Sequence, residues 1–264
     1  MKRLAPRLQV VGPLLRELVR REVRGRYAGS ALGFFWSVIH PLLQLAIYTL
    51  VFGVAYKQRM PNDPTLSGFA LFLFCGLLSY NALAESLTRG ASSLLENASL
   101  IKNLRFPAKA LQLALVLNAQ LHQMLGLLVL FASLVILRGG LSATVLLLPP
   151  LLLLEAAFFF GLAMLAASLA VAYRDLLQLL PVVTMVWFYA TPLIYQESMV
   201  PLRLHWLLMI NPARHFVSIT RALVLDGTPG MPRDWALAAL QAALMLAIGY
   251  AWFTRRHSEF ADEL

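Results

Sequence analysis

The stretch that decides the fold is residues 14–41, LLRELVRREVRGRYAGSALGFFWSVIHP, in which a cationic helix leads directly into an uncharged segment. At helical spacing its apolar face is formed by Leu14, Leu15, Leu18 and Val19, and its cationic face by Arg16, Arg20, Arg21 and Arg24. A basic amphipathic helix of this kind is expected to lie along an anionic membrane surface. The segment from Tyr27 to Tyr56 contains no Asp, Glu, Lys or Arg. We therefore predict that the chain rests on a membrane and then enters it.

The composition of the whole chain indicates the same class of protein. Hydrophobic residues make up 59% of the 264 residues, charged residues only 13%, and the mean hydropathy is +0.71. These values are typical of an all-α integral membrane protein. The formal net charge of +9 comes from cations that lie beside hydrophobic runs. This placement favours contact with lipid head groups and argues against nucleic-acid binding.

The apolar runs predict six transmembrane helices. A helix needs about 20 apolar residues to cross the hydrocarbon layer. The predicted spans are residues 36–56, 68–84, the charge-free stretch between Lys109 and Arg138, one span within 141–173, 176–195 and 235–254. The fourth region is too short for two spans and a turn, so it is interpreted as one.

Lysine and arginine residues in the connections predict the orientation. With the N-terminus inside, the inner segments hold 15 of the 22 Lys and Arg residues. This asymmetry predicts a multi-pass protein with both termini in the cytoplasm. The same topology places Glu155 near the outer end of the fourth span, where we expect it to lie at the membrane interface.

The connection between the fifth and sixth spans is unusual. It has apolar pieces at residues 202–210 and 215–225 that are too short to cross a membrane, and prolines interrupt them. Such segments are typical of re-entrant or interfacial helices that pack on protein or line a wet cavity. We therefore predict one transmembrane domain over residues 1–264. Its parts are an N-terminal interface helix (1–35), spans one to five (36–194), an outer re-entrant gate region (195–234), and the sixth span with a cytoplasmic tail (235–264).

A short amphipathic helix is expected between the second and third spans. Residues 92–107 read SSLLENASLIKNLRFP, and Asn97, Leu100, Ile101 and Leu104 lie close in angle around a helix that ends at Pro107. This helix could rest at the membrane interface, or it could dock into a groove on a soluble partner. The sequence contains no phosphate-binding glycine loop, no metal-binding pair and no nucleophile motif, so a transport role is favoured over an enzymatic one.

The order of several short motifs resembles one family along nearly the whole chain. The motifs are Arg26-Tyr27-Ala28-Gly29-Ser30, Leu32-Gly33, Trp36, Pro41, the segment Asn97 to Pro107, Tyr173-Arg174-Asp175, Thr191-Pro192 with Tyr195, Asn211-Pro212, Arg221 and Phe260-Ala261-Asp262. In this order they resemble the membrane subunits of polysaccharide-exporting ATP-binding-cassette transporters. The resemblance is greatest to the permeases that export lipid-linked O-antigen, with capsule and teichoic-acid exporters close behind.

The resemblance implies a homodimer in the bacterial cytoplasmic (inner) membrane, with the polymer passing along the dimer axis. Each subunit would dock on a separate nucleotide-binding ATPase subunit, present in two copies, which holds ATP and Mg. This chain would carry no cofactor, metal or catalytic residue of its own. The residues expected to couple to the ATPase are Asn97, Leu100, Ile101, Lys102, Arg105 and Phe106. Those expected on the interface helix are Arg20, Arg24 and Tyr27.

Aromatic residues are the candidates for the polymer path. A sugar polymer presents apolar ring faces and hydroxyl edges, which suit aromatic platforms with few fixed charges. The candidates are Phe34, Trp36 and Tyr48 around the first span, and Trp187, Phe188 and Tyr189 on the fifth. Tryptophan and tyrosine also mark membrane interfaces, so belt and tunnel roles are both open. For the outer gate the candidates are Asn211, Pro212 and Arg221.

Three other functions remain as alternatives. An intramembrane enzyme acting on a lipid-linked glycan would need several polar groups that converge inside the membrane, and the chain offers few. A membrane scaffold would account for the docking helix but not for the outer hairpin. An exporter of drugs or small lipids would share the topology, and the order of the motifs argues against it.

Overall fold

The structure is a computed structural model, and it describes residues 5–26, 29–60, 63–103, 107–257 and 260. Within these ranges the chain forms helices and connecting loops and no strand. The main helices are α1 (Ala5–Arg26), α2 (Trp36–Tyr48), α3 (Leu66–Glu96), α4 (Ala98–Asn103), α5 (Ala108–Arg138), α6 (Leu148–Ala172), α7 (Leu176–Ala190), α8 (His205–Ile210), α9 (Pro212–Arg221) and α10 (Pro232–Arg256). The predicted all-α fold is confirmed for the described residues.

Five helical stretches in this part of the chain are long and apolar enough to cross a membrane. They are Trp36–Ala55, Leu66–Glu96, Ala108–Arg138, Ala143–Ala172 and Pro232–Arg256. In the first stretch, α2 is extended by the π-helical turns Thr49–Ala55. These five stretches agree with the first four and the sixth of the predicted spans.

The predicted fifth span is shorter than expected. Helix α7 has 15 residues and ends at Ala190, five residues before the predicted end at Tyr195. The cause is Thr191-Pro192, because a residue before proline is disfavoured in helical geometry, and Thr191 has the extended angles φ −95 and ψ 134. At about 1.5 Å per residue α7 measures about 22 Å, less than the roughly 30 Å of the hydrocarbon layer.

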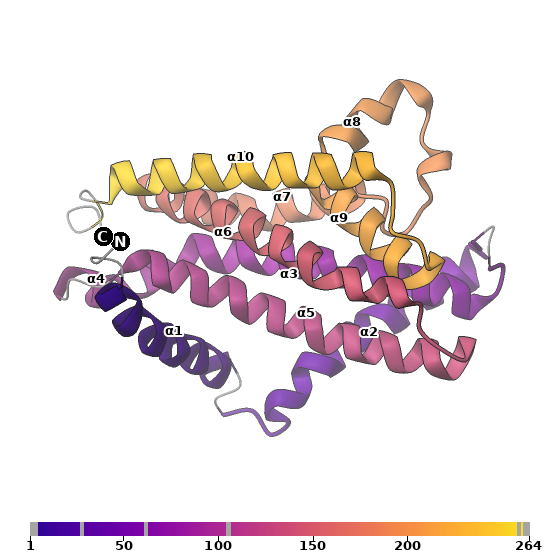
Figure 1. Cartoon of the computed structure of the whole chain (residues 1–264), viewed down its shortest axis with the longest axis horizontal. Helices are drawn as coiled ribbons and strands as arrows, with labels where there is room; N and C mark the ends of the chain where they lie inside the picture. Colours follow the sequence, from indigo (N-terminus) through magenta and orange to yellow (C-terminus); the bar gives the residue numbers. More distant parts are fainter. Residues whose placement is uncertain (1–4, 27–28, 61–62, 104–106, 258–259, 261–264) are drawn as a thin grey trace.

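The long helices lie side by side around α3 (Figure 1). In an apolar 18-residue segment of α3, 72% of the residues are buried. In the corresponding segment of Trp36–Ala55, which contains α2, only 6% are buried. Helix α3 is therefore the central element and α2 a peripheral one. The start of α1 and the end of α10 lie at the same end of the bundle, near α4, and the hairpin α8–α9 lies toward the opposite end (Figure 1).

Glycines allow α6 and α10 to approach closely. A Cβ on Gly249 would collide with the backbone carbonyl of Gly161, and a Cβ on Gly161 would collide with the backbone of Met245 and Leu246. Small residues at helix contacts are the usual way in which membrane helices gain packing energy, since lipid supplies no hydrophobic drive between helices. The α6–α10 contact therefore depends on the absence of a side chain at these two positions.

The predicted cytoplasmic helix over residues 92–107 is only partly correct. Residues 92–96 belong to the C-terminal end of α3 and not to a separate helix. Within this segment Ser93 and Leu94 are buried. Asn97 ends α3, and its Nδ2 donates to the Ser93 carbonyl at 2.9 Å. The separate helix is α4, which is six residues long.

Glu155 does not lie at the membrane interface, so that prediction is wrong. Its exposed fraction is 0%, and Gln123 Nε2 on α5 donates to its Oε2 at 2.7 Å. Gln123 Nε2 also lies 3.3 Å from Ser79 Oγ on α3. The helical stretch begins at Ala143, which places Glu155 several turns inside it, on the side that faces α5.

The N-terminal amphipathic helix is present, but its apolar face covers protein. Leu18 is 4% exposed and forms a cluster with Ala110 and Ala114 of α5, against which Leu14, Leu15 and Val19 also pack. The apolar face of α1 is therefore used to pack on α5, a contact that the sequence did not predict. Arg20 and Arg24, on the opposite face, are exposed.

Candidate functional site

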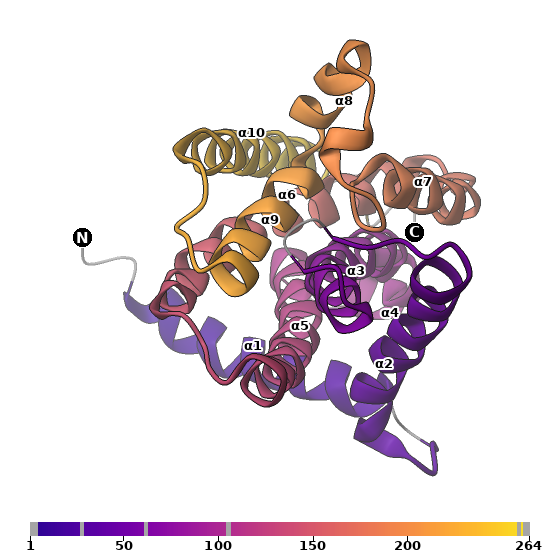
Figure 2. The same ribbon diagram turned by 90° about the vertical axis from the view of Figure 1, so that its right-hand side faces the viewer.

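A groove lined by aromatic side chains lies between α2, α3 and α7. Its volume is about 400 Å³, and it is lined by Tyr48, Tyr80, Ala84, Pro181, Thr184, Met185, Phe188 and Tyr189. Helices α2 and α7 flank α3 at one side of the bundle (Figure 2). None of the lining residues carries a formal charge at neutral pH. The groove therefore offers aromatic faces and neutral hydrogen-bonding groups.

Phe188 is the centre of this aromatic cluster. Its ring lies 5.4 Å from that of Tyr80 at 79°, 5.2 Å from that of Tyr189 at 83°, and 5.5 Å from that of Tyr48 at 40°. These are the edge-to-face and tilted arrangements that aromatic pairs prefer. The Tyr80 hydroxyl donates to the Thr184 carbonyl. The contacts connect α2, α3 and α7 and hold the rings in fixed orientations.

The predicted path residues separate into different places. Tyr48, Phe188 and Tyr189 line the aromatic groove. Trp36 lines a different cavity, described below. The indole Nε1 of Trp187 donates to Asn211 Oδ1 at 2.8 Å, so this ring braces α7 against the start of α9. The side chain of Phe34 lies outside the part that the structure describes.

Tyr80 is the aromatic residue of the groove that the sequence analysis missed. The sequence argument considered aromatic residues only on the first and fifth spans, whereas Tyr80 lies on the second. A signal was present, because a tyrosine in the middle of an apolar span needs a partner for its hydroxyl. Only the packing of α3 against α7 shows which partner it has.

At the end of the bundle opposite α4, Asn211 joins α8 and α9 (Figure 1). Its Oδ1 accepts from the Ala213 backbone N–H at 3.1 Å, which caps α9, and Pro212 occupies the first turn. Its Nδ2 lies 3.2 Å from the Ala190 carbonyl and 3.0 Å from Thr191 Oγ1. The predicted break between two short helices at Asn211-Pro212 is confirmed, and the Asn211 side chain also ties this break to the end of α7.

A charged cluster fixes the same hairpin to α10. Arg214 on α9 makes two hydrogen bonds to Glu197, at 2.7 and 2.6 Å, and also pairs with Asp234 at the start of α10. The Asp234 carboxylate lies 3.0 Å from His215 Nδ1 and 3.3 Å from Ser218 Oγ. Asp234 and His215 are buried, 4% and 0% exposed. Bidentate pairing of a guanidinium with a carboxylate is directional, so the Glu197 pair orients the Arg214 side chain, and Asp234 connects that side chain to the start of α10.

A further ion pair involves the loop before α3. Asp63 accepts a hydrogen bond from the Thr65 hydroxyl at 2.5 Å and pairs with Arg138 at 2.9 Å. The Thr65 hydrogen bond, assisted by Arg138, holds the pKa of Asp63 below its ordinary value. The Asp63 carboxylate therefore stays ionised and ties the loop before α3 to the C-terminal end of α5.

Arg221 is enclosed by backbone carbonyls. Its guanidinium donates to the carbonyls of Phe72 at 3.2 Å, Pro192 at 2.7 Å and Leu193 at 2.9 Å, and it lies 3.4 Å from the centre of the Phe72 ring. These contacts join α9, α3 and the turn after α7. The side chain therefore serves as a brace between these three segments.

Replacing Arg221 with alanine is expected to destabilise the protein by about 3 kcal/mol, because three buried carbonyls lose charge-assisted hydrogen bonds. Thermal unfolding of the purified protein in detergent measures the effect. The control is Arg203→Ala, since Arg203 is exposed on the same outer segment. An unchanged unfolding temperature combined with a new leak of small solutes would instead make Arg221 a pure gate residue and contradict the brace.

At the end of the bundle near α4, α1 is linked to the end of α3. Arg21 Nη2 donates to Asn97 Oδ1 at 2.8 Å, and Glu22 pairs with Arg89. Of the predicted coupling residues, Leu100 and Ile101 are half-buried on α4 and Lys102 is exposed. Arg105, Phe106 and Tyr27 lie outside the described residues.

Comparison with known proteins identifies the family to which the chain is related. A model of the ABC-2 type transporter family matches residues 13–225. The chain is 30% identical over 267 residues to the O-antigen export system permease protein RfbA of Myxococcus xanthus, and all of both chains is covered. It is 27% identical over 252 residues to the protein of the same name from Klebsiella pneumoniae, with 95% of each chain covered. It is also 22% identical over 243 residues to the polysialic acid transport protein KpsM of Escherichia coli, covering 90% of this chain and 92% of that protein. Because the family model matches most of the helical bundle and the relatives match it from end to end, this chain belongs to the ABC-2 type transporter family.

Proposed function

We propose that this chain is the membrane permease subunit of an exporter of lipid-linked polysaccharide of the O-antigen type. The observation that carries the proposal is its similarity along the whole chain to two relatives named O-antigen export permeases. The uncharged aromatic groove supports it, because aromatic faces stack on the apolar faces of sugar rings and neutral hydroxyls bond their edges. A polymer that must keep moving is better served by such weak, repeated contacts than by one tight site.

The proposed working unit is a homodimer. Helices α2 and α7 flank α3 on the side of the groove (Figure 2), and most of their side chains are exposed or half-buried. On α7 only Leu180 and Phe188 are buried, and the α2 stretch is 6% buried in its apolar window. A second copy facing this side would close two grooves into one tunnel. The polymer would then pass along the axis between the two copies.

The energy for transport is proposed to come from a separate ATPase subunit, present in two copies, which holds ATP and Mg. Helix α4 and the following residues Arg105 and Phe106 would form the docking element. The contact between Arg21 and Asn97 links this element to α1. A shift of α4 on the ATPase would therefore reach α1 and the inner half of α3 together.

The charge distribution supports an orientation with both termini in the cytoplasm, and the similarity to bacterial export permeases supports the inner membrane as the location. The hairpin α8–α9 would then lie at the outer face, where it could close the exit between polymers. Its attachment to α7 through Asn211 and to α10 through Arg214 supports a role in which the gate follows movements of these helices.

The experiment that tests the proposal is deletion of the gene in its host, followed by fractionation of the surface polysaccharide. We expect polymer to be made in normal amount and to be trapped on the inner side of the membrane. A complementing copy should restore surface polymer. Polymer that still reaches the surface in normal amount would contradict polysaccharide export, and the absence of any polymer would favour the enzymatic alternative.

A further inference from the structure

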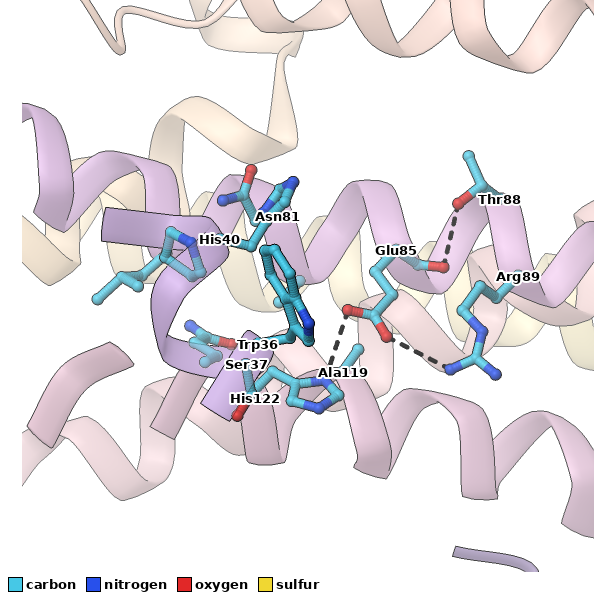
Figure 3. A pocket seen from close by; sticks show the side chains of 13 residues that line it. Trp36, Ser37, His40, Asn81, Glu85, Thr88, Arg89, Ala119 and His122 are labelled. Atoms are coloured by element: carbon cyan, nitrogen blue, oxygen red, sulfur yellow. Dashed lines mark hydrogen bonds and ion pairs between the residues drawn. The ribbon is translucent and has the colours of Figure 1, made fainter. Parts of the chain in front are cut away.

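A second cavity, separate from the aromatic groove, lies between α2, α3 and α5 (Figure 3). Its volume is about 340 Å³. Trp36, one of its lining residues, is 40% exposed, so the cavity opens to the surface of the bundle. Gln123 of α5 also lines it and is only 3% exposed. The cavity therefore leads from the surface to a polar residue of the buried interior.

Gln123 belongs to a row of buried polar side chains that crosses four helices. Its Nε2 donates to Glu155 Oε2 on α6 at 2.7 Å and lies 3.3 Å from Ser79 Oγ on α3. Ser79 Oγ lies 3.3 Å from Thr220 Oγ1 on α9. The exposed fractions of Glu155, Ser79 and Thr220 are 0%, 2% and 1%. The row therefore connects α6 with the second helix of the outer hairpin through the centre of the bundle.

No cation balances a negative charge on Glu155. Within the described residues its side-chain partners are the Gln123 amide and the Ser79 hydroxyl, both of which are neutral. In the described part of the chain it forms no ion pair. A carboxylate buried at membrane depth without a counter-charge is strongly unfavourable.

The ionisable groups of the packed helices have other partners. Within four residues of Ser79, Gln123 or Thr220 these groups are Cys75, Tyr80, His122 and Arg221. Arg221 donates to three backbone carbonyls, Tyr80 donates to the Thr184 carbonyl, His122 lies 3.6 Å from Glu85, and the Cys75 thiol is buried. On α10, residues 238–245 contain no ionisable side chain. None of these groups hydrogen-bonds to Glu155.

Two buried oxygens of the Glu155–Gln123 pair lack a hydrogen-bond donor. They are Glu155 Oε1 and Gln123 Oε1, and neither has a partner among the described residues. Leaving buried acceptors unsatisfied costs stability. A proton on Glu155 removes the charge and turns one carboxyl oxygen into a donor. On Gln123, the side chain that already bonds this carboxyl, Oε1 is an acceptor without a donor. One proton thus corrects both the missing charge balance and the missing donor.

The position of Glu155 along its helix limits how a proton can reach it. Five residues of 3-10 helix and the first seven of α6 place it about 20 Å from one end of the stretch Ala143–Ala172, and about 25 Å separate it from the other end. Glu155 is therefore far from both ends. Gln123, which lines the cavity, is the contact that connects it with the surface.

From this combination we infer that Glu155 is a proton-binding site inside the membrane domain, held as a neutral acid by Gln123 and able to exchange its proton through the cavity. The neutral pair joins α5 to α6, and Ser79 and Thr220 extend the contact to α3 and α9. The inference rests on the membrane location of the bundle and not on the identity of the polymer.

The test is infrared spectroscopy of the full-length protein at neutral pH, in a detergent that has no ester or carboxyl group. The carbonyl stretch of a protonated carboxylic acid lies at higher frequency than the bands of ionised carboxylates and amides, and it moves to lower frequency in D₂O. We expect this band in the wild-type protein, with the D₂O shift occurring in the folded state. Absence of the band would overturn the inference, and a shift that appears only after unfolding would overturn exchange through the cavity.

Glu155→Gln is expected to remove the band and to leave the unfolding temperature close to that of the wild-type protein, because the amide keeps the shape and the neutral state of the acid. The matched control is Glu96→Gln, which changes an exposed residue at the end of α3 and should keep the band. Persistence of the band in Glu155→Gln, or failure of this variant to fold, would contradict the assignment.

Two further measurements separate the proton from other occupants and test the role of Gln123. A sodium ion held by the same oxygens would displace the proton, so a band that disappears in sodium chloride but not in choline chloride would overturn the inference. We expect no difference between the two salts. Gln123→Leu removes the amide and should move the band to higher frequency, and an unchanged frequency would exclude Gln123 as the partner. The wild-type spectrum and Glu155→Gln decide the question even if Gln123→Leu does not fold. None of these measurements involves polysaccharide, so failure here is distinguishable from failure of the proposed function.

Discussion

Gly249→Val is expected to prevent accumulation of correctly folded protein. The added Cβ would collide with the carbonyl oxygen of Gly161, a backbone atom that cannot move without displacing α6. Overpacking a helix contact typically costs 1–3 kcal/mol, and a collision with backbone is expected to cost about 3 kcal/mol or more. The two helices would have to separate along a contact that closes one side of the bundle. The yield of monodisperse protein from detergent extracts and its unfolding temperature measure the effect.

The control for this substitution is Ala251→Val, which adds bulk two residues further along the same helix at an exposed position. We expect it to leave both yield and unfolding temperature near the wild-type values. Gly161→Ala should show the same defect as Gly249→Val, because its Cβ would meet the backbone of Met245. If Gly249→Val accumulated and unfolded like the wild-type protein, the close approach of α6 and α10 would be wrong.

Ala84→Trp is expected to reduce surface polysaccharide at least tenfold while the protein remains folded. Ala84 lines the aromatic groove from α3, opposite the rings on α7, and an indole there would occupy much of the space through which the polymer is proposed to pass. Because the new side chain enters an open groove, the cost to folding should be small compared with the loss of transport. Fractionation of the polymer and the amount of permease in the membrane are measured together.

The matched control is Ala239→Trp, which places the same large side chain at an exposed position on α10, away from the groove. Export by this variant should be close to normal. Normal export by Ala84→Trp would show that the polymer does not use the groove. It would leave the family assignment intact, because that assignment rests on the match over residues 13–225.

The long apolar helices were predictable because a membrane imposes a minimum length on any helix that crosses it. The stretches 36–55, 66–96 and 108–138 carry that signal in their composition alone. The end of α7 at Ala190 was harder to predict, because the apolar pattern continues to Tyr195. The local signal for this end is the dipeptide Thr191-Pro192. The break at Asn211-Pro212 was correctly predicted, since an N-cap side chain followed by proline is a local signal.

Local sequence signals did not identify which aromatic residues line the groove. Tyr48 and Tyr189 were candidates because of their residue type and span, but the sequence alone could not separate them from Trp36 and Trp187. All four are aromatic residues near apolar segments. Their different positions depend on the rotation of each helix about its axis, which is set by contacts with neighbours that are distant in sequence.

The sequence by itself determined that this chain is a helical membrane protein with a cationic amphipathic helix before its first apolar run, because charge and apolar length act locally and the bilayer selects for them. Its motif order also determined the resemblance to polysaccharide exporters, which the family match supports. Only the tertiary structure decided that the apolar face of α1 covers α5, that Glu155 is buried against Gln123, and that Arg221 is enclosed by carbonyls. The physical reason is that the burial and hydrogen bonding of a side chain depend on which helices pack against it. Those helices are distant in sequence, so local sequence signals do not specify the contacts.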